Sequence, residues 1–528
     1  MRDFHLPGRS PVFATNGVCA TSHPLAAQVA VRILESGGNA VDAAIAAGVL
    51  LGICEPQMTG IGGDCFVLLD APGQKDIIAL NGSGRAPARF SADALRDSGL
   101  TQIPERSIHA VTIPGAVDAF CTLSEDWGRL SLAETLTPAI HYAETGVPVA
   151  PRVALDWTIA DRDALLSGTA RSFYLQNGAA PQVGDVFRAP MQAKALRAIA
   201  KDGRAGFYAG DVAEDMVNSL KALGGAHELD DFEKPHAFYT DPISGTYKGV
   251  DLVEHPPNGQ GATAILLANI LSCFDLTALD PLGVDRAHIE AEATKLAYDA
   301  RNRIIADPDK TVRLEHMLSQ TTANQLAALI NPRQAMPSAT RLSEAVHRDT
   351  VYLTVVDRDR MAVSLIYSIF HSFGSGLASD KYGILFQNRG AGFNLTEGHP
   401  NEAGGTKRPM HTIIPGMLRE NGMVTMPFGV MGGAYQPNGH VRFLSNMVDY
   451  GMDVQTAIDA PRSFADQGVL RIERGYDPDV QAKLGEMGHS ITVSDTPIGG
   501  GQAIRVDHER GVLIGASDPR KDGCAIGY

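Results

Sequence analysis

One threonine in this 528-residue chain stands where its hydroxyl and its own amine could act together. Thr350 follows a polar, poorly periodic stretch and begins a run of β-forming residues that reaches Val356. A cut between Asp349 and Thr350 would free an α-amine whose pKa, about 7.7 to 8.0, lets it accept the hydroxyl proton near neutral pH. Thr350 is therefore a candidate nucleophile for an amide carbonyl, although an Asp-Thr pair before a strand is more often purely structural.

The sequence around this threonine predicts strands that would hold it in place. Residues 350–356 and 362–368 form two β runs joined by a turn at 357–360. Other strands are predicted at 65–69, 76–80, 247–254, 502–506 and 511–515. Helices are predicted as a pair within 21–52, over most of 115–235, over 263–306 and from 438 onward. Outer helices with antiparallel strands between them predict a layered α+β fold, in which 308–347 is a surface connection leading to Thr350.

The composition of the chain narrows its possible partners. It carries 60 acidic and 45 basic residues, a formal net charge of -15, which disfavours binding to nucleic acid. Its six cysteines show neither metal-binding nor disulfide spacing. The first residues lack the basic and apolar segments of a secretory signal, and the apolar stretch at 41–51 is too short to cross a bilayer. We therefore expect a cytoplasmic protein with no membrane partner, no metal and no cofactor.

Seven segments, in the same order along the chain, resemble the γ-glutamyltransferase family, a branch of the N-terminal nucleophile hydrolases. They are HPLAAQVAVRILESGGNAVDAAIAAGVLLGICEPQMTGIGGDCFVLL (23–69), IPGAVDAF (113–120), EATKLAYDAR (292–301), DTVYLTVVDRDRMAVSLIYSIFHSFGSGL (349–377), GILFQNRGAGF (383–393), KRPMHTIIPGM (407–417) and GVMGG (429–433). The resemblance implies a four-layer αββα sandwich made from one precursor. Self-cleavage would give a large subunit, 1–349, and a small subunit, 350–528, which stay associated and can oligomerise further.

The same resemblance implies roles for residues near the nucleophile. Thr350 would attack the carbonyl that precedes it in the precursor, and a substrate amide in the mature enzyme, forming an acyl-enzyme. Gly432 and Gly433 match a glycine pair whose backbone N–H groups stabilise the tetrahedral oxyanion; the alternative is a plain tight turn. Ser368 matches a hydroxyl residue beside the catalytic threonine, and taken alone it would be an ordinary strand residue.

The substrate-binding positions depart from the family pattern. Where the family has a carboxylate-binding arginine, a serine pair, an asparagine, a glutamine and an aspartate, this chain has Ser83, His411-Thr412, Phe370, Arg389 and Gly392. The acid that would pair with a substrate ammonium is thus lost. The guanidinium of Arg389 suits a substrate carboxylate, or else a structural ion pair. His411, next to Thr412, could donate a hydrogen bond to substrate or buttress a loop, and Arg85 could reach the pocket.

Three hypotheses remain open from the sequence. The first is a self-cleaving threonine amidohydrolase that acts on a small amide bearing a carboxylate, with oxamate as the specific candidate. The second keeps γ-glutamyl transfer or glutathione hydrolysis, with an altered grip on the glutamyl group. The third is a non-catalytic scaffold or binding protein, which the retention of Thr350, Ser368 and the glycine pair disfavours.

Overall fold

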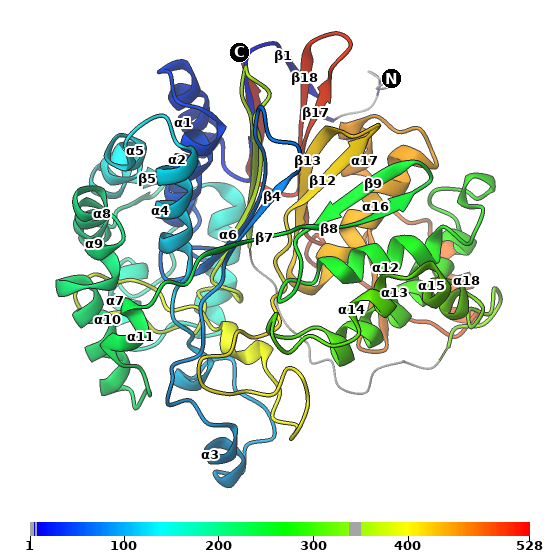
Figure 1. The fold of residues 1–528 in the computed structure, drawn as a ribbon. Helices are drawn as coiled ribbons and strands as arrows, with labels where there is room; N and C mark the ends of the chain where they lie inside the picture. Colours follow the sequence, from blue (N-terminus) through cyan, green and yellow to red (C-terminus); the bar gives the residue numbers. More distant parts are fainter. Residues whose placement is uncertain (1–4, 6–7, 337–349) are drawn as a thin grey trace.

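The computed structural model describes residue 5, residues 8–336 and residues 350–528. Two seven-stranded sheets lie face to face in the middle of the molecule, and helices cover the outer side of each (Figure 1). These four layers form an αββα sandwich, so the predicted fold class is confirmed.

Both large sheets are antiparallel throughout. The first sheet consists, from edge to edge, of β19 (Cys524–Gly527), β2 (Val18–Thr21), β10 (Val351–Val356), β11 (Ala362–Ser368), β3 (Asp64–Asp70), β4 (Ile78–Gly82) and β7 (Phe238–Thr240). The second consists of β1 (Val12–Ala14), β18 (Val512–Ser517), β17 (Gly500–Asp507), β13 (Met423–Met431), β12 (Gly416–Glu420), β9 (Val250–Glu254) and β8 (Ile243–Tyr247). Smaller sheets pair β14 (Ser463–Asp466), β15 (Val469–Ile472) and β16 (Ser490–Val493), and β5 (Val147–Pro148) with β6 (Val186–Phe187).

Most helices fall into two groups, one on each side of the paired sheets, while one short helix, Ala92–Asp97, lies below the sheets in this view (Figure 1). Before β7 come α1 (Pro24–Glu35), α2 (Ala40–Cys54), α3 (Ala92–Asp97), α4 (Ala116–Trp127), α5 (Leu132–Thr145), α6 (Pro151–Arg162), α7 (Thr169–Tyr174), α8 (Pro190–Asp202), α9 (Ala205–Tyr208), α10 (Gly210–Ala222) and α11 (Leu229–Glu233). After it come α12 (Gly261–Leu271), α13 (Val284–Ile304), α14 (Leu314–Leu318), α15 (Gln320–Ala327), α16 (Gln436–Val448), α17 (Val454–Asp459) and α18 (Pro478–Glu486). Short 3₁₀ turns occur at η1 (Ile108–Ala110), η2 (Leu276–Ala278), η3 (Arg389–Gly392) and η4 (Gly433–Tyr435).

Helix α2 explains why β10 and β11 are held firmly. Every one of its residues is buried, as expected for a helix that is apolar all round and lies between other layers. Asn39 caps its first turn in a reciprocal capping box with Asp42, which fixes where the helix begins. The helix packs on β10 and β11, and the buried carboxylate of Asp357, in the turn between them, accepts a hydrogen bond from the Ala40 amide.

The register of β10 and β11 determines the neighbours of the candidate nucleophile. Val351 pairs with Tyr367, so the same register continued by one residue sets Thr350 opposite Ser368. On the other side of β11, Ser368 pairs with Asp64 of β3. Three polar side chains on adjacent strands therefore form one row at the end of the sheet.

Most predicted elements are present, and the differences from the prediction are of three kinds. The stretch 247–254 was predicted as one strand, but it contains the turn of a hairpin, because Lys248 and Gly249 both have positive φ and separate β8 from β9. The predicted surface connection includes two short helices, α14 and α15. Several strands were not predicted, among them β1, β2 and β7 of the two large sheets and β19 at the C-terminal end. No helix in the part of the chain that the structure describes is both long and apolar enough to cross a membrane.

Candidate active site

Thr350 and Ser368 form the first part of the site. Both are buried, and the Thr350 hydroxyl donates to Ser368 Oγ at 3.2 Å. Ser368 Oγ also accepts from the Phe370 amide at 2.8 Å, which holds the serine oxygen in a fixed position. The two hydroxyls predicted from the sequence to be neighbours are therefore brought together. Asp349, on the other side of the predicted cut, lies outside the described residues.

Arg389 adjoins this pair, in the turn η3. Its Nη2 donates to Ser368 Oγ at 3.3 Å and its Nη1 to Thr412 Oγ1 at 2.9 Å. The guanidinium lies 4.0 Å from the centre of the Phe370 ring. Phe370 has a φ of 81°, a strained conformation for a bulky residue of the kind found at functional sites. Burial lowers the pKa of Arg389 to about 9, against the opposing effect of the Asp64 charge, so this side chain is still a cation at pH 7.

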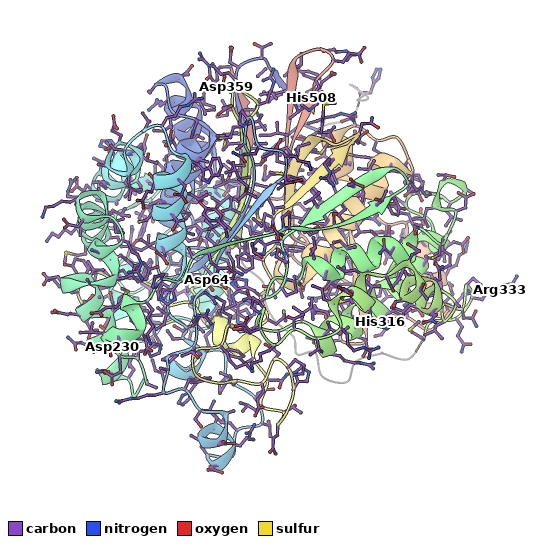
Figure 2. The ribbon with its side chains drawn as sticks, in the orientation of Figure 1. Asp64, Asp230, His316, Arg333, Asp359 and His508 are labelled. Carbon is purple, nitrogen blue, oxygen red and sulfur yellow. The ribbon has the colours of Figure 1, made fainter. Side chains whose placement is uncertain are left out.

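Asp64 is a site residue that sequence reasoning missed. Asp64 is completely buried, and Figure 2 labels it nearer the middle of the view than the exposed Asp230 and Arg333. Its Oδ1 accepts hydrogen bonds from the Gly84 and Gly115 amides and from the Gln387 side chain, at 2.8 to 3.1 Å. Burial alone would raise the pKa of Asp64, but the hydrogen bond from His411 and the charge of Arg389 outweigh it and hold the pKa below its ordinary value. The available signal was an acid placed between a glycine pair and an apolar strand, in GIGGDCF.

Both ring nitrogens of His411 are hydrogen-bonded to other parts of the protein. Its Nε2 lies 3.0 Å from Asp64 Oδ2, and its Nδ1 accepts from the Ile413 amide at 3.4 Å. Burial and the nearby Arg389 charge lower the pKa of His411 to about 3, so the ring is neutral at pH 7 and its Nε2–H donates to Asp64. Because both ring nitrogens have partners, the geometry favours the buttressing alternative over a hydrogen bond to substrate.

The glycine pair lies at the end of β13 and opens the turn η4. Gly432 has a φ of 128° and Gly433 a φ of 56°, and a Cβ on Gly432 would lie 3.0 Å from the Gly499 Cα. Neither glycine amide donates to a carbonyl or side chain of the described residues. A buried pair of such N–H groups could donate to an oxyanion, and this role of the two glycines stays a prediction.

A single side chain joins the glycine pair to the rest of the site. Gln260 Nε2 donates to the carbonyls of both Thr412 and Gly433, at 2.6 Å and 2.9 Å. Through Thr412, Arg389 and Ser368, a continuous chain of hydrogen bonds thus runs from the glycines to Thr350. This link was not predicted from the sequence, because nothing in the bend NGQG indicates which segments it would contact.

One remaining prediction concerns a position away from this chain of contacts. Arg85 donates to the Thr406 carbonyl at 2.8 Å and lies 3.9 Å from Asp307, and its side chain is 37% exposed. No described contact joins it to Thr350 or Arg389, so its role in the pocket stays a prediction.

The sequence predicted no metal site, yet the fold brings together His288, Glu292 and His489, with possible ligand atoms within 4.8 Å of one another. Their polar atoms already hydrogen bond to each other or to Asn331, Lys295 and Met336.

Replacing Asp64 with asparagine is expected to lower the free energy of unfolding by about 3 kcal/mol at pH 7, because it removes a buried charge that faces Arg389 and accepts from His411. Since the folded state holds the pKa of Asp64 below its ordinary value of 3.8, this stability is complete above that value and is lost as the pH falls through the folded pKa. Chemical denaturation of the wild type and of Asp64→Asn at pH 7, 5 and 3 measures the difference in their free energies of unfolding. The difference between the two proteins should narrow only at pH 3; an equal difference at all three values would point to packing instead of charge.

Replacing Gly432 with alanine is expected to lower kcat about 100-fold, because the positive φ and the contact with Gly499 would displace the amides that are predicted to bind the oxyanion. Gly511→Ala is the matched control, since Gly511 has a φ of 69° with open space around it and lies in the turn between β17 and β18. Steady-state kinetics of both variants makes the comparison. Equal kcat values for the two would show that Gly432 is an ordinary turn residue.

Comparison with known proteins gives the following similarities. A family model described as gamma-glutamyltranspeptidase matches residues 26–528. The chain is 36% identical to the "Glutathione hydrolase-like YwrD proenzyme" of Bacillus subtilis (strain 168), over 98% of this chain and 99% of that protein. It is 33% identical to the oxamate amidohydrolase proenzyme of Klebsiella pneumoniae, over 98% and 99%. Among solved structures, the cephalosporin acylase from Bacillus halodurans is similar with a TM-score of 0.93 at 37% identity, over 100% of this chain and 99% of that one.

Proposed function

The chain belongs to the gamma-glutamyltranspeptidase family and is an amide-bond hydrolase of the N-terminal nucleophile type. From this premise we propose that it cuts itself before Thr350 and hydrolyses a small amide that bears a carboxylate. Oxamate is the specific candidate. The names of its relatives refer to glutathione, oxamate and cephalosporins, so the choice among substrates rests on the site itself.

The observation that carries this proposal is the state of Arg389. The side chain is completely buried beside the nucleophile, and no carboxylate of the described residues lies within ion-pair distance of it. Its Nε has no hydrogen-bond partner there either. The Asp64 charge acts on Arg389 without contacting it, and a buried cation with no anion in direct contact is costly, a cost that is offset when a substrate carboxylate enters. The arrangement argues against the structural ion pair that the sequence left open.

The same geometry favours a short acyl group. Arg389 is joined to Thr350 through one intervening side chain, Ser368, so a carboxylate held by the guanidinium would lie close to the attacked carbonyl. In oxamate the carboxylate is bonded directly to the amide carbon. The Phe370 ring covers one side of the guanidinium and leaves little room on that side for a longer chain.

In the reaction proposed here, the α-amine of Thr350 accepts the proton of its own hydroxyl as the oxygen attacks the amide carbon. The N–H groups of Gly432 and Gly433 stabilise the oxyanion that forms. The amine then gives the proton to the departing nitrogen, which leaves as ammonia when oxamate is the substrate. A water molecule, deprotonated by the same amine, attacks the acyl-enzyme and releases the acid, restoring the threonine hydroxyl.

Hydrolysis of γ-glutamyl compounds is the second candidate, because of the glutathione hydrolase-like relative. A glutamyl substrate would need an acid for its ammonium. Asp64 is the buried carboxylate that acts on Arg389, and its oxygens already accept from two amides, Gln387 and His411. The site therefore supports carboxylate recognition better than ammonium recognition.

A matched pair of substrates separates the two candidates. Glutaryl and γ-glutamyl p-nitroanilides differ only by the α-amino group, and oxamate is assayed beside them through ammonia release. We expect oxamate to be the best substrate and both longer anilides to be poorer ones, with the glutaryl compound having a kcat/KM at least ten times that of the γ-glutamyl compound. A preference for the γ-glutamyl compound would overturn the proposed substrate class and leave the family activity in its place.

A further inference from the structure

Gln260 occupies an unusual place between the two halves of the site. It lies in the bend before α12, and its side chain is completely buried. An amide nitrogen has two N–H groups, and here one faces the Thr412 carbonyl and the other the Gly433 carbonyl. One side chain thus joins the segment that contacts Arg389 to the segment that carries the oxyanion glycines.

Arg301, near the end of α13, fixes the orientation of this amide. Its Nη1 donates to Gln260 Oε1 at 2.9 Å. A guanidinium has only donors, so the amide oxygen must face Arg301 and the amide nitrogen must face the two carbonyls. The flipped amide would set its nitrogen against the Arg301 donor and its oxygen against two carbonyl oxygens, which leaves a single arrangement.

The Gln260 contact completes a set of restraints on residues 432–435, which we call the oxyanion turn. The Gly432 carbonyl accepts from the Tyr435 amide at 3.1 Å, and the Ala434 carbonyl accepts from the Tyr298 hydroxyl. With Gln260 on the carbonyl between them, three successive peptide planes are held through their oxygens. The Gly432 carbonyl shares its peptide plane with the Gly433 N–H, and Gln260 holds the plane that follows, so the turn is restrained through its oxygens while the N–H groups of Gly432 and Gly433 are not used.

We propose that Gln260 is a positioning residue for catalysis: it sets the separation between the oxyanion amides of Gly432 and Gly433 and the carboxylate anchor at Arg389. The inference rests on the proposed function for the role of Arg389. The hydrogen bond from Gln260 to the Gly433 carbonyl, in the oxyanion turn, does not depend on which substrate the enzyme uses. An error of about 1 Å in such a separation is enough to cost about 100-fold in rate.

Gln260→Met tests this role, because methionine fills a similar volume and makes none of the three hydrogen bonds. We expect kcat to fall 10- to 100-fold while KM changes less than threefold, since Arg389 still binds the carboxylate. Gln260→Glu should be at least as damaging, because a carboxylate would face two carbonyls without a donor. Kinetics are measured on whichever of oxamate and the two anilides the wild-type enzyme turns over fastest.

Gln455→Met is the matched control. Gln455 is also buried and also bridges segments: its amide nitrogen donates to the Ser517 carbonyl and to Asp459, and its oxygen accepts from the Ser517 amide. It has no contact with the oxyanion turn. Loss of its hydrogen bonds should lower stability as much as Gln260→Met does and leave kcat unchanged. Equal kcat values in the two methionine variants would overturn the inference.

Hydrogen exchange followed by mass spectrometry gives a second readout that needs no substrate. In Gln260→Met, the peptide that covers 432–435 should exchange at least tenfold faster than in the wild type, while peptides from β10 and β11 stay unchanged. If that peptide exchanges at the wild-type rate, Gln260 does not position the turn. A wild-type enzyme inactive on all three substrates would instead contradict the proposed function and leave this measurement valid.

Discussion

Replacing Thr350 with alanine is expected to leave the protein as one uncut chain of 56.1 kDa and to abolish amide hydrolysis. The proposed mechanism uses one hydroxyl for both reactions, so its removal should stop self-cleavage and turnover together. Loss of a nucleophile typically costs at least about 10⁴-fold in kcat. Denaturing gel electrophoresis shows the cut, and ammonia release from oxamate measures the activity.

Thr350→Ser is the control, because serine keeps the hydroxyl that donates to Ser368. We expect it to be cut into fragments 1–349 and 350–528, more slowly than the wild type, and to keep measurable activity. Two fragments from the alanine variant would mean that another group or a protease makes the cut. One uncut but active wild-type chain would remove the need for a free α-amine.

The fold could be predicted largely from local patterns. The α2 region is apolar all round, and the runs at 350–356 and 362–368 flank a short polar turn, so these elements are specified by their own residues. The layers then follow, because helices that bury a face must cover a sheet. The hairpin within 247–254 was missed because Lys248 carries no sequence signal for a left-handed conformation.

The site was predicted less completely, and for a physical reason. Thr350 and Ser368 were named from the resemblance to the family, and their closeness agrees with two predicted strands that pair across a short turn, which is a local property. Asp64 reaches them through strand β3, almost 300 residues earlier in the chain, and Gln260 through a bend before α12. Such contacts depend on which distant segments become neighbours, and no spacing in the sequence encodes that. For the same reason the neutral state of His411 could not be foreseen, because it depends on burial and on the charge of Arg389.

Replacing Arg389 with methionine is expected to lower kcat/KM for oxamate and for the glutaryl anilide by about 100-fold or more, because a carboxylate buried without its partner loses a charge-assisted pair worth about 2 to 5 kcal/mol. A pentanoyl anilide, which has the same chain length and no carboxylate, should be hydrolysed slowly and equally by both proteins. The quantity to measure is the ratio of kcat/KM for the glutaryl anilide to kcat/KM for the pentanoyl anilide. Arg389→Lys should give an intermediate ratio, since an ammonium keeps the charge but cannot contact Ser368 and Thr412 as a fork does.

Arg389→Met should not lower the unfolding temperature of the protein. Burial lowers the pKa of Arg389, which means that the folded protein holds this charge at a cost at every pH below about 9. An uncharged side chain removes that cost, so Arg389→Met should unfold at the wild-type temperature or higher while losing its substrate preference. Such a combination is expected of a residue kept for binding at the expense of stability. A large fall in the unfolding temperature together with an unchanged anilide ratio would make Arg389 a structural residue, and the carboxylate would then need another anchor.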